Sequence, residues 1–160
     1  MFREMRRKQQ LLDEKESIAI LERGTAGVLA LFGDEDYPYA VPISYVYDNS
    51  KLYFHSAVNG HKIDAVKKSD KASFCVIDQD CIVPEEYTTY YRSVIAFGRI
   101  RILEEESEKR AAIELLARKY YPADTQTGRT DTINGAWPRL CLLELKIEHI
   151  TGKAARELMN

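Results

Sequence analysis

The alternation of apolar and polar positions predicts several short strands in the first third of the chain. Residues 26–32 form an almost wholly apolar run between glycines, with the length of a buried strand. Apolar and polar side chains alternate along residues 37–47, which predicts a strand. Pro42 predicts an edge strand, a bulge or a gap in the sheet at this point, because proline cannot donate a ladder hydrogen bond. The Asp-Asn-Ser sequence at 48–50 predicts a hairpin turn into a strand at 51–56.

Three further strands are predicted later in the chain. Residues 72–77 are mostly apolar, and residues 140–150 place leucine and isoleucine against charged residues in strict alternation. The strand predicted over 87–103 is long and is expected to bend near Gly98. Polar stretches without periodicity predict loops at 78–86 and 122–136.

Three helices are predicted between these strands. Asp13 followed by Glu16 resembles a capping box and predicts a helix that ends before Gly24. A second helix is predicted over 59–68, and apolar residues spaced i, i+3, i+4 and i+7 predict a third over 104–120. Since the strands pair mainly by hairpins and the helices are inserts, we expect a mainly β fold, a six-stranded antiparallel barrel decorated by about three helices.

Length and charge narrow the function classes. A chain of 160 residues suits one domain, here 13–160, preceded by a basic N-terminal extension at 1–12. The net charge of −2 gives no electrostatic support for binding nucleic acid or a membrane surface. Three cysteines without metal-ligand spacing favour a reducing compartment and predict no metal site. Since the sequence contains neither a secretory signal nor an apolar run of about 18 residues, we expect a cytoplasmic protein.

The segment 52–65 contains the most suggestive chemistry. It begins as a strand, breaks at an Asn-Gly pair and restarts as a short helix that Asn59 is expected to cap. The free N–H groups of the first helical turn then lie beside His61 and Lys62, which predicts a seat for a phosphate group. The alternative is a surface crossover with a solvated His-Lys pair.

Several common catalytic motifs are missing from the sequence. It contains no glycine-rich dinucleotide loop, no P-loop and no nucleophile elbow, and its carboxylates cluster in predicted helices and turns. If the protein is an enzyme, we therefore expect a cofactor to carry the chemistry and the protein to supply its binding site.

Short sequences that occur in order along the chain resemble one known family. They lie at 42–45, 52–57, 60–65, 74–78, 90–98 and 150–153. Together they resemble the nitroimidazole-resistance branch of the pyridoxamine 5'-phosphate oxidase-like flavoproteins. The resemblance implies a split β-barrel that binds FMN at a homodimer interface and acts on a small molecule. FAD or a deazaflavin would be alternative cofactors in the same barrel.

The resemblance also assigns roles to individual residues. The first strand segment would run beside the flavin ring, the strand end and helix start would hold the phosphate, and the long strand would approach the flavin from the partner subunit. These three groups are Pro42, Ile43, Ser44 and Tyr45; His55, Ser56, His61 and Lys62; and Tyr91, Arg92 and Ser93. Trp137 is expected either near the cofactor or in the core. His55 is the predicted catalytic proton donor, its alternative being a structural hydrogen bond.

The expected function is reduction of a small electron-poor substrate, such as a nitroaromatic, by an FMN-dependent oxidoreductase. Vitamin B6 oxidation is not expected, because His61-Lys62 stands where the pyridoxamine phosphate oxidases proper carry an Arg-Lys pair. Two alternatives are a flavin-binding protein without turnover, such as a store or redox sensor, and a small barrel that binds haem.

Overall fold

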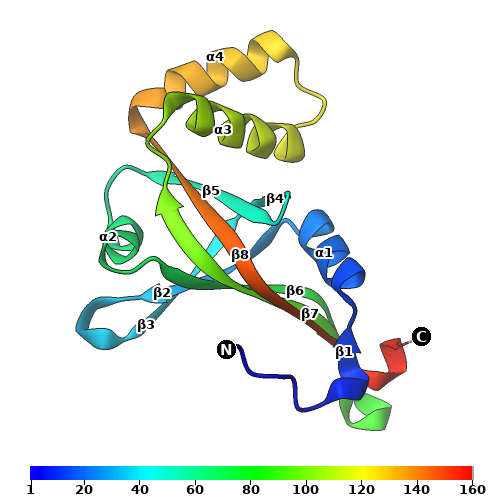
Figure 1. The fold of residues 1–160 in the computed structure, drawn as a ribbon. Coiled ribbons are helices and arrows are strands. Elements are labelled where there is room, and N and C mark those ends of the chain that lie inside the picture. Colours follow the sequence, from blue (N-terminus) through cyan, green and yellow to red (C-terminus); the bar gives the residue numbers. More distant parts are fainter. Residues whose placement is uncertain (160) are drawn as a thin grey trace.

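Eight strands form one antiparallel sheet that curls into a barrel (Figure 1). The structure is a computed structural model and describes residues 1–159. The order of the strands is β3-β2-β6-β7-β8-β5-β4, and β1 pairs with β8. The strands are β1 (Leu11–Leu12), β2 (Ala26–Phe32), β3 (Pro38–Ser44), β4 (Val46–Asp48), β5 (Lys51–Ala57), β6 (Lys71–Val83), β7 (Thr88–Ile102) and β8 (Leu140–Ala154).

Four α-helices cover parts of the barrel. Helix α1 packs against β8, β4 and β7, and α2 packs against β2 and β7. Helix α3 lies across β5, β8 and β4, with α4 beside it, so both lie on the same side of the barrel (Figure 1). The helices are α1 (Glu14–Arg23), α2 (His61–Lys68), α3 (Glu106–Tyr120) and α4 (Gln126–Ala136).

The predicted fold class is confirmed, although the structure has eight strands and four helices rather than six and three. Strand β2 has the predicted bounds, and Asp13 caps α1 by accepting a hydrogen bond from the Glu16 N–H at 2.7 Å. The predicted bend near Gly98 is also confirmed, because the register between β7 and β8 shifts between Phe97 and Gly98.

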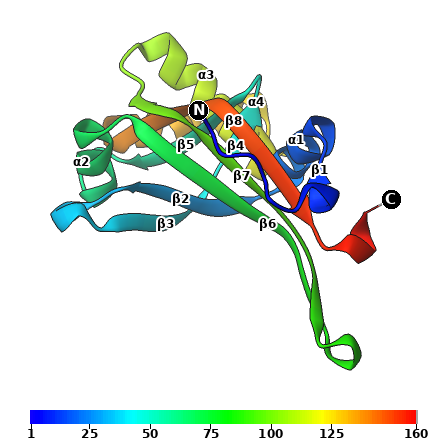
Figure 2. The same ribbon diagram turned by 60° about the horizontal axis from the view of Figure 1, so that its bottom comes forward.

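Two predicted loops are wrong. The stretch 78–86 continues β6 to Val83 and forms, with the start of β7, a two-stranded arm that projects from the barrel (Figure 2). The stretch 122–136 contains α4, which the Thr125 side chain caps by accepting from the Gly128 N–H. The last strand also runs on to Ala154, beyond the predicted end at residue 150.

The barrel has two apolar clusters, one on each face of the sheet. The interior cluster includes Leu29, Phe54 and Phe74, which are all fully buried. On the outer face, Leu142 and Leu116 belong to a second cluster that α3 covers. Because side chains alternate along a strand, β8 contributes Leu143 to the interior and Leu142 to the outer cluster.

Strands β3 and β4 are the two ends of the sheet, and the barrel is split between them. In the chain the two strands are separated by a single residue, Tyr45. The Tyr45 side chain is fully buried, and its hydroxyl donates to the Leu21 carbonyl at 2.8 Å. The predicted gap at Pro42 is wrong, because Pro42 pairs with Val28 in the edge strand β3. The alternative prediction of an edge strand is confirmed.

The Tyr120 hydroxyl, from the end of α3, bridges the split. It accepts from the Tyr45 N–H at 3.0 Å and lies within donating distance of the Tyr45 carbonyl, at 2.9 Å, and of the Thr25 carbonyl. Lys119 donates to the Gly24 carbonyl beside it, and its ammonium lies 4.3 Å from the centre of the Tyr45 ring. Burial lowers the pKa of Lys119. Side chains at the end of α3 therefore provide hydrogen-bond partners for backbone groups that have no partner in a neighbouring strand.

We expect Tyr120→Phe to lower the free energy of unfolding by about 1–3 kcal/mol, because the Tyr45 N–H at the split loses its acceptor. Denaturant unfolding followed by circular dichroism measures the change. Tyr121→Phe is the matched control, since that ring is 62% exposed and its substitution should change stability little. Equal stability of the Tyr120 variant and the wild type would contradict the bridging role.

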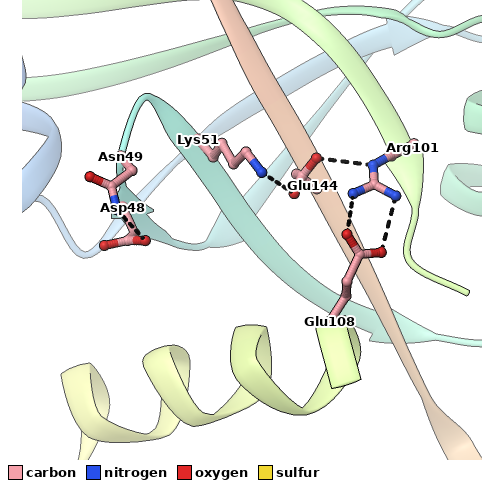
Figure 3. A network of polar contacts seen from close by, with 6 residues as sticks. All are labelled: Asp48, Asn49, Lys51, Arg101, Glu108 and Glu144. Carbon is pink, nitrogen blue, oxygen red and sulfur yellow. Dashed lines mark hydrogen bonds and ion pairs between the residues drawn. The ribbon is translucent and has the colours of Figure 1, made fainter. Parts of the chain in front are cut away.

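A charged network ties α3 to the outer face of the sheet (Figure 3). Glu144 of β8 has a side chain only 7% exposed and accepts from Lys51 and from Arg101, each at 3.0 Å. Arg101 also donates to Glu108 of α3, at 2.8 and 3.2 Å. Burial would raise the pKa of Glu144, but the hydrogen bonds from Arg101 and Lys51 outweigh it and the pKa is lowered.

The lowered pKa of Glu144 predicts a loss of stability in acid. The ionised Glu144 contributes to the free energy of unfolding, and this contribution is fully present above the unfolded-state pKa of about 4.3. It is lost as the pH falls through the lower folded-state pKa. Glu144→Gln should lower the free energy of unfolding at pH 7 by roughly 2–3 kcal/mol and flatten its decline between about pH 5 and pH 3. Denaturant titrations across that range measure both effects.

The matched control is Glu148→Gln, because Glu148 is on the same strand but 43% exposed and bonds the exposed Arg99. It should change stability by at most about 1 kcal/mol. An acid dependence as steep in the Glu144 variant as in the wild type would rule out Glu144 as its source.

The N-terminal segment is attached to the sheet at two points. Phe2 stacks on His149 with ring centres 4.6 Å apart and lies 5.6 Å from Phe97, so it covers part of the outer face of β7 and β8. Strand β1 then pairs with Lys153 and Gly152 of β8. The predicted extension 1–12 therefore ends within the sheet. The predicted domain ran to residue 160, which lies outside the described residues.

Candidate functional site

The start of α2 has the backbone geometry of an anion site. Strand β5 ends at Ala57, and Gly60 precedes the helix with φ 127°, a conformation that favours glycine. The first bond of the helix runs from the Asp64 N–H to the Gly60 carbonyl at 3.1 Å, so the N–H groups of residues 61–63 have no acceptor within the helix. The predicted cap at Asn59 is wrong, because Gly60 is the cap residue and no side chain caps the helix.

Ser56 and Lys62 come together at this helix start. The Lys62 ammonium donates to the Ser56 hydroxyl at 3.3 Å. Ser56 alternates with Leu52 and Phe54, so it lies on the inner side of β5, and both members of the pair are half-buried. We call this pair, with the N–H groups of residues 61–63, the Ser56–Lys62 seat. One cation, one hydroxyl and a positive helix end suit a bound phosphate.

His61 is at the margin of the seat and contacts the turn between β2 and β3. Its ring stacks on Tyr39 with centres 4.0 Å apart, and its Nε2 lies 3.7 Å from the Asp34 carboxylate. Lys68 holds the same turn by donating to the Gly33 carbonyl at 3.2 Å. The imidazole is therefore positioned by the hairpin rather than by the seat.

The other predicted residue of β5, His55, lies on the opposite face from Ser56. It pairs with Leu142 of β8 and is exposed on the outer side of the strand. Trp137 also lies on the outer side, where it packs on the second cluster with the Lys109 ammonium and the Arg110 guanidinium 4.6 and 4.5 Å from its ring centre. The structure thus places Trp137 against packed side chains, which corresponds to the second of its two predicted positions, the core.

The predicted flavin-side strand divides between the two faces of the sheet. Ile43 packs on the interior cluster, whereas Pro42 is exposed and Ser44 half-buried on the outer face. Tyr45 is in the core, and its backbone is held by Tyr120. Pro42 and Ser44 are therefore the members of this group that face outward.

Tyr91, Arg92 and Ser93 of β7 lie in the other half of the sheet. The Tyr91 hydroxyl accepts from Gln10 at 3.3 Å, and Arg92 donates to Asp78 at 3.3 Å. Asp78, at the register shift of β6, also receives two bonds of 2.7 Å from Arg23, and these bonds lower its pKa. Arg23 and Asp78 are 55 positions apart, so no local sequence signal indicated this pair.

The outer face of β3, β2, β6, β7 and β8 has a row of small and apolar residues. Register places Pro42, Val28, Cys75, Ile95 and Thr151 next to one another on five adjacent strands. Ile95 is 38% exposed, and the buried apolar residues of α1 and α2 belong to the interior cluster rather than to this row. We call this surface the uncovered face.

The predicted site residues lie toward opposite ends of the uncovered face. His61 lies beside Asp34, just beyond the Phe32 end of β2, whereas Ser93 pairs with Ile77 toward the Ala26 end. Six residues of strand separate these ends, which corresponds to about 20 Å. One chain therefore does not bring all the predicted residues together.

Within residues 1–159, no group of three or more His, Cys, Asp or Glu side chains is arranged to hold a metal ion. In the same part of the chain, no helix is both long enough and apolar enough to cross a membrane.

Comparisons with known proteins identify the fold. The family model described as pyridoxamine 5'-phosphate oxidase matches residues 13–154. No curated protein sequence matches the chain significantly.

The chain is also similar to several solved structures. A proposed 5-nitroimidazole antibiotic resistance protein from Bacteroides thetaiotaomicron is 22% identical, with a TM-score of 0.77 over 90% of this chain and 86% of that one. A conserved hypothetical protein from Mycobacterium tuberculosis is 15% identical, with a TM-score of 0.82 over 97% and 92%. An FAD- and haem-binding protein from Mycobacterium smegmatis is 18% identical, with a TM-score of 0.70 over 92% and 74%.

Proposed function

Because the chain belongs to the pyridoxamine 5'-phosphate oxidase family, as predicted from its motifs, we propose that it is an FMN-binding flavoprotein and an oxidoreductase. The observation that carries the proposal is the Ser56–Lys62 seat, which joins an ammonium and a hydroxyl to a helix N-terminus. The seat has the donors that a phosphate monoester accepts, and it lies beside the Phe32 end of the uncovered face.

In this proposal Lys62 supplies the positive charge that balances the FMN phosphate. Ser56 and the N–H groups of residues 61–63 supply neutral donors, which together fix the position of the phosphate. His61 lies at the edge of the phosphate site, stacked on Tyr39, and Asp34 limits its use as a phosphate donor by competing for the imidazole. Pro42 and Ser44 face the flavin ring along the outer side of β3.

The active form in this proposal is a homodimer that buries the uncovered face. Since the seat and Tyr91–Ser93 are about 20 Å apart along one chain, a twofold axis through the face would bring one chain's seat toward its partner's long strand. The apolar row centred on Cys75 and Ile95 supports such an isologous contact.

The proposed reaction is hydride transfer to a small electron-poor substrate, which is the chemistry that a bound flavin supplies. Similarity to the Bacteroides protein supports a nitroaromatic as the substrate. The chain's own contribution is to hold the cofactor, to exclude water between the two subunits and to deliver a proton. His55, exposed on the outer side of β5, is the proposed donor of that proton through its imidazole.

We expect His55→Ala to reduce turnover roughly 100-fold, the usual contribution of one general acid, without changing the flavin content. Steady-state rates with NAD(P)H and a nitroimidazole measure turnover. The ratio of flavin to protein absorbance measures the flavin content. An unchanged rate, or a rate loss that only follows flavin loss, would exclude His55 as the donor.

A visible absorption spectrum of the purified protein tests the proposal directly. Two flavin bands, with FMN as the chromophore released by acid, are the expected result. Released FAD would support a larger flavin. A Soret band would favour haem, an alternative that the FAD- and haem-binding relative supports. A colourless protein that also fails to bind added FMN would refute the proposed function.

A further inference from the structure

A cleft lies at the root of the arm formed by β6 and β7, toward the other end of the sheet from the Ser56–Lys62 seat of the same chain. Its volume is about 740 Å³, within the usual range for small-molecule sites. The walls come from the N-terminal segment, from Thr88, Thr89 and Tyr91 of β7, and from the turn that follows β8. Both terminal segments pass the root of the arm (Figure 2).

Positive charge is concentrated around this cleft. Arg6, Arg7, Lys8 and Arg156 line it with Glu157 as the one carboxylate, although the whole chain has a net charge of −2. Lys8 pairs with Glu4 at 2.9 Å on the surface. The cleft therefore has a local excess of guanidinium groups.

These guanidinium groups differ from those that hold ion pairs elsewhere in the molecule. Arg23, Arg99 and Arg101 each hold a carboxylate at 2.6–2.8 Å. No carboxylate within residues 1–159 lies within ion-pair distance of Arg6, Arg7 or Arg156. Their charge is thus available to an anion from solution.

The arginine-bearing segment is fixed to the barrel by a buried residue. Gln10 is 6% exposed and donates to the Tyr91 hydroxyl at 3.3 Å, while its side-chain oxygen accepts from Arg7 at 3.4 Å. Its N–H also donates to the Arg7 carbonyl at 3.0 Å. Gln10 thereby positions Arg7 at the cleft, and β1 continues the attachment along β8.

We propose that this cleft binds the phosphate groups of a phosphorylated small molecule. Planar guanidinium groups bind phosphate oxygens in pairs, and the Thr88 and Thr89 hydroxyls at the same wall can donate further hydrogen bonds. The Tyr91 ring, with the Lys153 ammonium 5.4 Å from its centre, closes the far side. Within one chain the site uses neither Ser56 nor Lys62, and of the residues proposed to approach the partner's flavin it includes only Tyr91.

Isothermal titration of the purified protein with pyrophosphate and with ADP, at low and at moderate salt, tests the site. Both compounds should bind, and affinity should fall as salt rises because salt screens the attraction between exposed charges. Equal affinities for pyrophosphate and ADP would show that the cleft recognises only the phosphate groups. Tighter binding of ADP than of pyrophosphate would show that it recognises a nucleotide. Either result supports the site.

The test variant is Arg7→Glu with Arg156→Glu, which should weaken both probes at least tenfold and leave the flavin content unchanged. Lys15→Glu with Arg118→Glu makes the same charge change elsewhere on the surface and should leave both affinities unchanged. If charge reversal prevents folding, Arg7→Gln with Arg156→Gln provides the neutral version. Absence of binding to the wild type at millimolar probe, or undiminished binding to the variant, would overturn the site. The first failure leaves the flavin proposal intact.

Discussion

Replacing Lys62 with glutamate should abolish retention of the flavin. The variant removes the ammonium of the Ser56–Lys62 seat and places a carboxylate where the FMN phosphate is proposed to lie. A hydrogen bond to a charged group contributes about 1.5–3 kcal/mol, and repulsion between like charges adds a penalty of similar size. The affinity for FMN should therefore fall by about 100-fold or more.

The ratio of flavin to protein absorbance after gel filtration, followed by titration with FMN, measures this loss. Lys67→Glu is the matched control, because Lys67 is exposed in the last turn of the same helix and its reversal changes the net charge equally. Far-ultraviolet circular dichroism and thermal unfolding show whether both variants fold. A Lys62→Glu protein that keeps one FMN per chain would refute the phosphate assignment.

Replacing Ile95 with glutamate should convert the proposed dimer to monomers. Ile95 is at the centre of the uncovered face and is 38% exposed in a single chain, so the variant monomer can keep its carboxylate in water. Dimerisation would then bury two carboxylates related by the twofold axis, each with a desolvation penalty of several kcal/mol. We expect dimer affinity to fall at least 100-fold, with loss of flavin because the partner's residues no longer reach it.

Sedimentation velocity with matched flavin spectra tests this expectation. Ile82→Glu is the control, because Ile82 is 72% exposed on the arm and outside the uncovered face. It should leave both the dimer and the flavin intact. A wild-type protein that sediments as a monomer while holding flavin would refute the interface.

The sequence predicted those elements whose pattern is set by one buried face. The apolar run of β2 and the periodic α3 are such elements, and the hairpin turn has positive φ angles at Asn49, which tolerates them, and at Ser50. The arm was missed because water surrounds most of it, so residues 78–83 show no alternation of apolar and polar positions. Helix α4 was missed because only Arg129 and Ile133 are buried along its 11 residues.

The candidate site was predicted in part for a similar reason. Ser56 and Lys62 are six positions apart and belong to one local motif, so their contact followed from the strand-to-helix turn. The bridge from Tyr120 to Tyr45 spans 75 positions, and nothing in either local sequence indicates it. Side-chain direction was also undetermined, since His55 and Ser56 face opposite sides of β5, and only pairing with β8 fixes which side each faces.

We expect the Glu144 network to act also as a check on strand alignment during folding. Tyr53 and Arg101 lie opposite Glu144 on the two neighbouring strands, with Lys51 and Arg101 as its ion partners. Sliding β8 by one position would turn this carboxylate into the barrel interior, without its cations and among leucines. Misaligned intermediates would therefore be penalised far more heavily than apolar packing alone could achieve, and an apolar substitute at position 144 should fold with more frequent alignment errors even if its native state is stable.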